Sequence, residues 1–227
     1  FAGKRTKLLT NKGLLLNSGA TVDNDGPKNY VTYGNFENGL STGWSLNHTT
    51  LSSNIPNQAS GSWTSAAGTL STSIVSSGQL AGLYSLSLAS SAATTAGDML
   101  VSQAYTIDKE DQGKVLSFKF YYSAITNSTN NNFSGTVSNT WQPYIYDVTN
   151  SAWIQPTGVY SISQGSGVGY SYCQWQVPSN MTSFRVAIVC INASTGATTL
   201  YFDDIFCGPS QYNIGAIRPP VGTILPY

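Results

Sequence analysis

Charged residues, histidine and cysteine are all scarce in this chain. Of its 227 residues 9% are charged, ten basic side chains balance ten acidic ones, and there are one histidine and three cysteines. The zero net charge gives no electrostatic reason to expect nucleic acid or a membrane surface as a partner of the whole chain. No apolar run reaches the roughly 20 residues of a membrane-spanning helix, so we expect no membrane insertion. The chain opens on Phe1 without a signal peptide, and we expect an earlier segment to have been removed.

The scarcity of histidine and carboxylates also argues against catalysis. His48 has no nucleophile motif near it, so a Ser-His-Asp or Cys-His arrangement has little support. Asp203 and Asp204 are adjacent, so on one strand they point to opposite faces and cannot form the carboxylate pair of a glycosidase. The only glutamates are Glu37 and Glu110. The sequence also lacks a phosphate-binding loop and a His/Cys metal cluster, and we predict that the chain is not an enzyme.

The cysteines do not follow a metal-binding pattern. Cys173, Cys190 and Cys207 are odd in number and lack the spacing of metal ligands. Cys190 lies within the apolar run 184–191, where a cysteine behaves as a small hydrophobic side chain. We predict buried thiols, with a disulfide as the alternative.

In place of charge, the chain has abundant Ser, Thr, Gly and Asn together with 12% aromatic residues, a composition typical of extracellular or virion-surface β-proteins. In residues 115–122, Leu116, Phe118 and Phe120 alternate with Ser117 and Lys119, as in a half-buried antiparallel strand. Runs bounded by Gly, Asn, Ser and Pro clusters predict strands at 69–75, 80–88, 99–106, 114–124, 141–148, 152–154, 170–177, 183–191 and 198–206. We predict an all-β fold, an antiparallel two-sheet jelly-roll sandwich with extended N- and C-terminal arms.

Three segments differ in composition. We predict an N-terminal docking arm at residues 1–29 and one jelly-roll domain at residues 30–209. Residues 210–227 are extended, apolar and proline-rich, and we expect them to be a linker that leads to a further domain. Basic residues gather in the N-terminal arm, either as a solvated tail or as a surface that docks onto an acidic partner; they are Lys4, Arg5, Lys7 and Lys12.

Two aromatic-rich segments bracket the predicted domain and contain three of the few carboxylates. Residues 35–39 include Glu37, and the strand-like residues 200–206 include Asp203 and Asp204. One of these aspartates must face inward, where a carboxylate needs hydrogen bonds or a cation. A structural calcium ion held by Glu37 with Asp203 or Asp204 is one prediction. The alternative is that these carboxylates accept hydrogen bonds from backbone N–H groups in turns.

Aromatic side chains and amides alternate on two predicted strands, which favours sugar binding over catalysis. Flat C–H faces of sugar rings stack on aromatic rings, while Gln, Asn and Asp pair with the hydroxyl groups. The best candidates for glycan binding are Trp141, Tyr144, Tyr146 and Trp175. The alternative is that these rings fill the sandwich core or a subunit interface.

The bracketing segments resemble jelly-roll carbohydrate-binding modules of the family 4/9 type. Those modules begin with a strand of the form Asn-x-x-Phe-Glu-x-Gly-x-x-Gly-Trp and end with a strand that contains Asp-Asp or Asp-Asn. The matching residues here are Asn35, Phe36, Glu37, Gly39, Gly43 and Trp44, followed by residues 200–205 near the end. The resemblance covers roughly residues 30–208, and it also implies a structural calcium near Glu37 with Asp203 or Asp204.

The flanks are similar to parts of phage proteins. Residues 219–227 look like the opening of a phage tail-collar domain, and many tail fibres place a jelly-roll module between a docking arm and such a collar. The resemblance implies a structural component of a phage tail fibre or virion appendage, in an extracellular location. Expected partners are other virion proteins, sister chains in a homotrimer and a cell-surface glycan. The alternative is a non-catalytic carbohydrate-binding module of a secreted polysaccharide-degrading enzyme.

Overall fold

The computed structural model describes residues 28–32, 34–39, 41–76, 80, 82–124, 140–158, 162–163, 167–194 and 196–209. The chain divides into two compact units, and the unit formed by Tyr30–Ser210 contains every strand of the described residues. Apart from Lys28 and Asn29, the predicted arms at 1–29 and 210–227 lie outside the described residues.

Among the described residues, the larger sheet has eight strands. Its order is β11-β10-β14-β7-β1-β4, with β12 paired to β10 and β8 paired to β14. These strands are β1 (Trp44–His48), β4 (Thr64–Ser65), β7 (Asp98–Ser102), β8 (Tyr105–Thr106), β10 (Thr140–Asp147), β11 (Ala152–Ile154), β12 (Ile162–Ser163) and β14 (Ser183–Asn192). All of these pairings are antiparallel.

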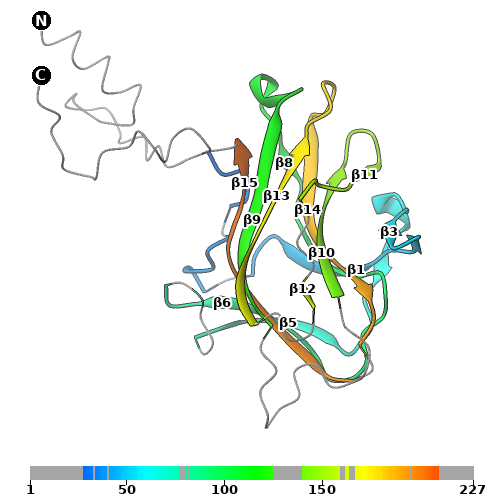
Figure 1. Cartoon of the computed structure of the whole chain (residues 1–227), viewed down its shortest axis with the longest axis vertical. Helices are drawn as coiled ribbons and strands as arrows, with labels where there is room; N and C mark the ends of the chain where they lie inside the picture. Colours follow the sequence, from blue (N-terminus) through cyan, green and yellow to red (C-terminus); the bar gives the residue numbers. More distant parts are fainter. Residues whose placement is uncertain are drawn as a thin grey trace, which may run out of the picture. The chain divides into compact units, whose positions relative to one another are not determined.

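The second sheet has five strands within the described ranges, in the order β13-β9-β15-β6-β5 (Figure 1). These are β5 (Leu70–Val75), β6 (Ser85–Ser90), β9 (Val115–Ala124), β13 (Gly167–Gln176) and β15 (Thr198–Pro209). A small hairpin of β2 (Leu51–Ser52) and β3 (Ile55–Pro56) and two 3-10 turns, η1 (Ser60–Ser62) and η2 (Lys109–Asp111), complete the described elements. No helix in this part of the chain has the length and apolar character to cross a membrane.

Apolar side chains that alternate along the strands fill the space between the two sheets. On β9, Phe118 and Phe120 are fully buried, whereas Val115 and Tyr121 on the opposite face are 45% and 41% exposed. Burial of each such large side chain contributes roughly 1.5–3 kcal/mol. The larger sheet adds further core residues, which include Leu100, Trp141, Ile145, Val186 and Ile188. The predicted all-β antiparallel sandwich is confirmed, and each predicted strand overlaps a strand of the structure.

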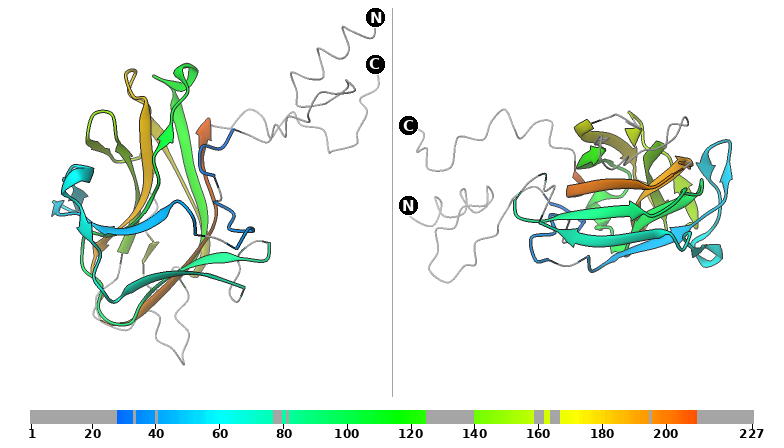
Figure 2. Two further views of the ribbon diagram at one scale, coloured as in Figure 1. Left: turned by 180° about the vertical axis from the view of Figure 1, so that it is seen from behind. Right: turned by 90° about the horizontal axis from the view of Figure 1, so that it is seen from below.

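Strand β10 is buried on both faces, because a second layer covers the outside of the larger sheet. Trp141 and Ile145 face the main core, whereas Tyr144 belongs to a second apolar cluster against which Leu51 and Trp63 pack. We call residues 49–65, which hold β2, β3 and η1, the covering segment. It is drawn in cyan at the side of the sandwich in Figures 1 and 2. Alternation therefore does not separate buried from exposed positions on this strand.

The first described residues run along the last strand. The Tyr30 N–H donates to the Cys207 carbonyl at 2.8 Å, and the Ile205 N–H donates to the Gly34 carbonyl at 2.9 Å. A Cβ atom at Gly34 would overlap the Ile205 carbonyl, so glycine permits this close approach. The resemblance implies a strand from Asn35, but the regular strand begins at Trp44, and the intervening residues are mainly turns.

The three cysteines are buried thiols, and none forms a disulfide. Burial raises the pKa of the Cys173 thiol to about 12 and, despite a hydrogen bond with Thr94 that lowers it, the pKa of Cys190 to about 12 as well. The prediction of buried thiols is confirmed, and such thiols are poor nucleophiles near neutral pH.

Candidate functional site

Four aromatic rings gather on the outer face of β10 and β11. Trp63 lies 4.8 Å from Tyr146 and 5.5 Å from Trp153, measured between ring centroids. Trp153 also lies 5.0 Å from Tyr146 and 6.2 Å from Tyr144. We call Trp63, Tyr144, Tyr146 and Trp153 the outer aromatic cluster. Most of these contacts are edge-to-face, a geometry that adds about 0.5–1.5 kcal/mol per pair beyond the burial of area.

The backbone of the covering segment holds these rings in place. The indole N–H groups of Trp63 and Trp153 both donate to the carbonyl of Gln58, at 3.1 and 2.9 Å. The Ser60 N–H donates to the hydroxyl oxygen of Tyr146 at 2.7 Å. The Tyr144 hydroxyl donates to the carbonyl of Asn54 at 3.2 Å. Hydrogen bonds therefore tie both indoles and both phenols of the cluster to the same short segment.

The cluster has a buried floor and a partly exposed upper layer. Tyr144 and Tyr146 are completely buried, whereas Trp63 and Trp153 keep part of their surface in solvent. Burial raises the pKa of the Tyr144 hydroxyl above its ordinary value. Beneath these rings lie apolar side chains from β7 and β14, which are Met99, Val101, Ala187, Val189 and Ile191. The two indoles are therefore the rings of this cluster that a ligand from solvent can reach.

The four aromatic residues predicted to bind glycan do not lie together. Trp141 and Trp175 are 0% and 2% exposed in the main core between the sheets, where Trp175 packs 5.3 Å from Phe184. Tyr144 and Tyr146 lie on the other side of the larger sheet, under the two indoles. As the side chains lie here, none of the four predicted rings presents a face to solvent on which a sugar could stack.

Trp63 and Trp153 are not among the four rings predicted from the sequence to bind glycan. A signal for Trp153 was present in the sequence, because the short strand 152–154 follows β10 closely and antiparallel pairing places Trp153 opposite Tyr146. Trp63 follows the 3-10 turn η1, and we find no sequence pattern that would have placed it in the cluster.

The carboxylates of the bracketing segments contact a different part of the fold. Both oxygens of Glu37 accept a hydrogen bond from the N–H of Leu83, at 2.8 and 3.0 Å, and one also accepts from Tyr84 at 3.2 Å. Asp203 is 1% exposed and accepts a hydrogen bond from the Ser85 hydroxyl at 3.0 Å. Its other oxygen accepts from the Asp204 N–H at 2.8 Å. The backbone-donor alternative therefore describes the contacts of Glu37.

Acidic side chains come close together at another place in the described residues. Oxygens of Asp108, Glu110 and Asp111 at η2 lie within 4.8 Å of one another, and this is the one such group of three possible metal ligands among the described residues. The Asp111 carboxylate accepts a hydrogen bond from the Tyr30 hydroxyl at 2.5 Å and lies 3.8 Å from the Lys114 ammonium. Glu37, Asp203 and Asp204 do not form such a group among the described residues.

The single histidine supports the fold of the larger sheet. The His48 Nδ1 lies 3.1 Å from a carboxylate oxygen of Asp98, which is completely buried. Asp98 also accepts hydrogen bonds from the N–H groups of Thr95 and Ala67, at 2.9 and 3.3 Å. These contacts give His48 a structural role at the point where β1 pairs with β7.

No family model and no curated protein matches this sequence. Among solved structures, the enzymatically active domain of tailspike protein 4 from bacteriophage CBA120 matches with a TM-score of 0.50 and 13% identity, over 79% of this chain and 21% of that chain. The C-terminal family 22 carbohydrate-binding module of Clostridium thermocellum Xyn10B matches with a TM-score of 0.50 and 14% identity, over 82% of this chain and 96% of the module. This chain thus spans about a fifth of that tailspike chain. The likeness is one of fold, and the chain has the antiparallel jelly-roll sandwich of carbohydrate-binding modules.

Proposed function

We propose that this chain is a non-catalytic carbohydrate-binding module in which Trp63 and Trp153 form the sugar-stacking surface. The observation that supports this most is that two partly exposed indoles, 5.5 Å apart, are fixed by one backbone carbonyl. Sugar rings stack their C–H faces on such aromatic surfaces. The likeness in fold to the family 22 module adds support.

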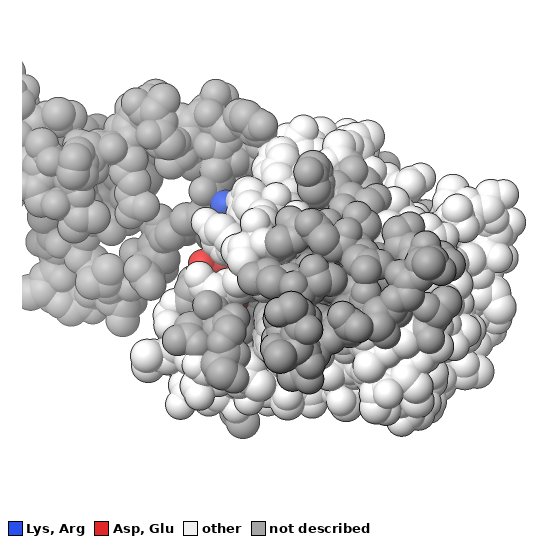
Figure 3. Space-filling model, turned by 60° about the horizontal axis from the view of Figure 1, so that its bottom comes forward, with Lys and Arg blue, Asp and Glu red and all other residues white. Residues whose placement is uncertain are grey.

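The rings are fixed before any ligand arrives, which favours affinity. Immobilising a mobile side chain on binding costs about 0.5–1.5 kcal/mol, and the hydrogen bonds to Gln58 remove much of that cost for both indoles. The amide of Gln142, whose oxygen lies 3.2 Å from the Tyr144 hydroxyl oxygen, lies on the same strand face and supplies polar groups for sugar hydroxyls. On the face of the molecule in Figure 3, few of the described atoms belong to charged residues.

Isothermal titration calorimetry with xylan, mixed-linkage β-glucan and mannan tests the proposal. We expect at least one polysaccharide to bind, and Trp63→Ala and Trp153→Ala each to weaken binding tenfold or more, which corresponds to about 1.4 kcal/mol. Leu83→Ala is the matched control, because this exposed side chain lies on another part of the fold. Binding that both tryptophan substitutions leave unchanged would contradict the proposed site.

We further propose that the module belongs to a phage tail fibre or another virion appendage, outside the cell, as a homotrimer with other virion proteins as partners. The tailspike domain that shares the fold and the collar-like residues 219–227 support this setting. The alternative, a module of a secreted polysaccharide-degrading enzyme, has comparable support from the Xyn10B module. Multi-angle light scattering on the 227-residue chain separates them, since we expect a trimer and a stable monomer would contradict the assembly.

We also propose a structural calcium ion at Glu37 and Asp203. A carboxylate that is 1% exposed, as in Asp203, is costly without a compensating partner, and calcium prefers carboxylate oxygens. Such an ion would join the two bracketing segments.

A further inference from the structure

A row of tyrosines lies on the outer face of the five-stranded sheet, away from the outer aromatic cluster. Antiparallel pairing of β13 with β9 sets Tyr170 directly opposite Tyr121 and sets Tyr172 opposite Lys119. The residues between them on β9 and β13, such as Phe120, point into the core. We call Tyr121, Tyr170, Tyr172, Lys119 and Asp204 the tyrosine face.

The tyrosine face is exposed and has fixed geometry. Tyr121 and Tyr170 are 41% and 43% exposed, and their ring centroids lie 4.9 Å apart with an interplanar angle of 51°. The hydroxyl of Tyr172 lies 3.3 Å from the Ser117 hydroxyl. The Lys119 ammonium lies 4.6 Å from the centre of the Phe206 ring, which holds this cation at the margin of the face. These side chains stand on regular paired strands, which position them more rigidly than a loop would.

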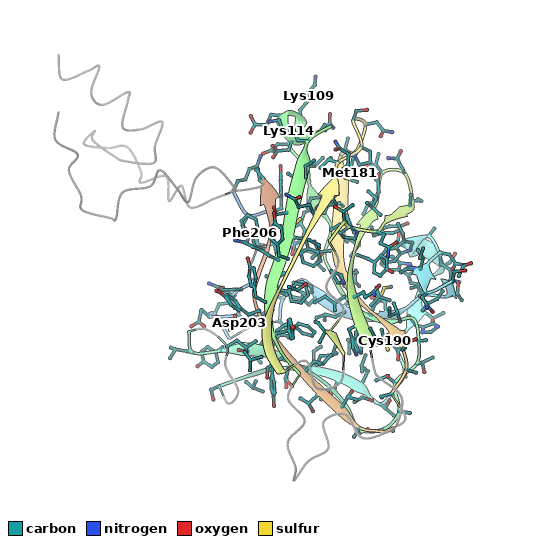
Figure 4. All side chains as sticks on the ribbon, viewed as in Figure 1. Lys109, Lys114, Met181, Cys190, Asp203 and Phe206 are labelled. Carbon is teal, nitrogen blue, oxygen red and sulfur yellow. The ribbon has the colours of Figure 1, made fainter. Side chains whose placement is uncertain are left out.

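A bulge in β15 lies next to the strand that carries Tyr121. The pairing of β15 with β9 shifts register between Asp203, opposite Tyr121, and Phe206, opposite Lys119; both labelled residues can be followed along β15 in Figure 4. Within the bulge, Asp204 has a φ of 47°, which is uncommon for a residue other than glycine. Bulges re-aim side chains, and here Asp203 is buried while Asp204 is exposed.

The negative charge of Asp204 affects the pKa of Tyr170. Burial is the largest cause that raises the pKa of Tyr170 to about 12, and the neighbouring Tyr121, Tyr172 and Asp204 raise it further. Asp204 is therefore an exposed acceptor next to a pair of exposed rings.

The distribution of polarity argues against a protein interface at this face. The exposed aliphatic side chains, Val115 and Val168, are 45% and 61% exposed but lie at opposite ends of the β9–β13 pair, opposite Gln176 and Ser123. Between them lie the phenols of Tyr121 and Tyr170, and the Lys119 ammonium lies at the margin of the face. The exposed aliphatic side chains therefore do not form the contiguous apolar centre of a stable dimer interface.

We propose that the tyrosine face is a second carbohydrate-binding site, which takes a neutral saccharide chain. Tyr121 and Tyr170 stack against sugar rings, while Asp204 accepts hydrogen bonds from sugar hydroxyls and the Tyr172 hydroxyl and the Lys119 ammonium complete the polar contacts. This site lies on the opposite sheet from Trp63 and Trp153, so it binds independently of the proposed function of that cluster. Two sites on one module would let it bridge neighbouring glycan chains.

Titration calorimetry with xylohexaose, cellohexaose and mannohexaose tests the second site in a Trp63→Ala/Trp153→Ala background. We expect this variant to retain binding of one hexaose with a stoichiometry of one. Adding Tyr121→Ala and Tyr170→Ala is expected to weaken the retained binding at least tenfold, and Asp204→Asn to weaken it severalfold. Val168→Ala, an exposed position on the same strand, is the control and should leave binding unchanged.

The outcomes separate the two sites. If the tryptophan variant binds none of the hexaoses while the unsubstituted chain binds one, the first site stands and the second is overturned. If the tyrosine substitutions remove all binding and the tryptophan substitutions remove none, the second site stands alone. Self-association in sedimentation velocity that Tyr121→Ala/Tyr170→Ala abolishes would instead assign the face to a second copy of this chain. Thermal melts of each variant confirm that it is folded.

Discussion

The carboxylates of Glu37 and Asp203 converge on one short stretch of chain, although one residue precedes the first strand and the other lies in the last. Glu37 accepts hydrogen bonds from the N–H groups of Leu83 and Tyr84, and Asp203 accepts one from the hydroxyl of the next residue, Ser85. The residues at the start of β6 are therefore hydrogen-bonded to residues near both ends of the domain.

Substitution of these acids should destabilise the fold to different degrees. Asp203→Ala leaves the buried Ser85 hydroxyl without this acceptor, at a cost of roughly 1–3 kcal/mol. Glu37→Ala affects an exposed side chain and should cost about 1 kcal/mol or less. Urea unfolding measures both, and Glu37→Gln, which keeps one acceptor oxygen, should lie between Glu37→Ala and the unsubstituted chain. An Asp203→Ala variant as stable as the unsubstituted chain would contradict a structural role for this carboxylate.

Calcium removal tests the metal proposal. We expect chelation with EDTA to lower the melting temperature and excess calcium to restore it, because an ion that binds only the folded state stabilises it by about 2.7 kcal/mol at a hundredfold excess over its dissociation constant. Glu37→Gln should reduce the response to calcium. An unchanged melting temperature would leave the hydrogen bonds as the sole support of the two carboxylates.

Replacement of Gly34 should weaken the contact between the first described residues and β15. A Cβ atom there would overlap the Ile205 carbonyl, a backbone atom that cannot move without shifting the strand. We expect Gly34→Ala to cost roughly 1–3 kcal/mol in the free energy of unfolding, as other overpacking substitutions do. Gly68→Ala is the control, since a Cβ at Gly68 meets nothing within 4 Å. Equal melting temperatures for the two variants would show that the close approach does not matter.

The buried thiols should make stability depend on alkaline pH. Burial raises the pKa of Cys173 from 9.0 to about 12, so between these values the folded state retains a proton that the unfolded state loses. The stabilising effect is complete below pH 9 and is lost as pH rises towards 12. Urea midpoints at pH 7, 9 and 10.5 should fall above pH 9, and Cys173→Ala should reduce the fall. If Cys173→Ala leaves the fall of the urea midpoint above pH 9 unchanged, the pH dependence of stability belongs to other groups.

The sequence predicted the sandwich well where a strand has one face in the core and one in solvent, as β9 does. Residues 115–122 alternate as expected, and Tyr121 is exposed on the side opposite Phe118 and Phe120. Alternation failed for Trp141 and Tyr144, which lie on opposite faces of β10, because the covering segment buries the face that would otherwise be solvated. Which loop covers which sheet is a property of tertiary packing, and no local pattern encodes it.

The contacts of Glu37 and Asp203 were also only partly predictable. That a carboxylate in a turn accepts backbone N–H groups follows from general chemistry, but its partners near Leu83 depend on how β6 enters its sheet. The tyrosine face could in principle have been predicted from the sequence, since Tyr121 and Tyr170 both alternate with buried residues. Their direct opposition depends on the register of β9 and β13, which the sequence does not specify.

A single carbonyl, that of Gln58, orients both exposed indoles of the outer aromatic cluster. The orientations of the two rings are therefore coupled, and a displacement of the backbone at Gln58 would tilt both of them together. Changes in length or sequence along residues 49–65 could widen, narrow or close this surface while the strands beneath it stay in register. If the proposed function holds, ligand preference would thus diverge among proteins of this architecture through one surface loop, while the strands keep their pairing.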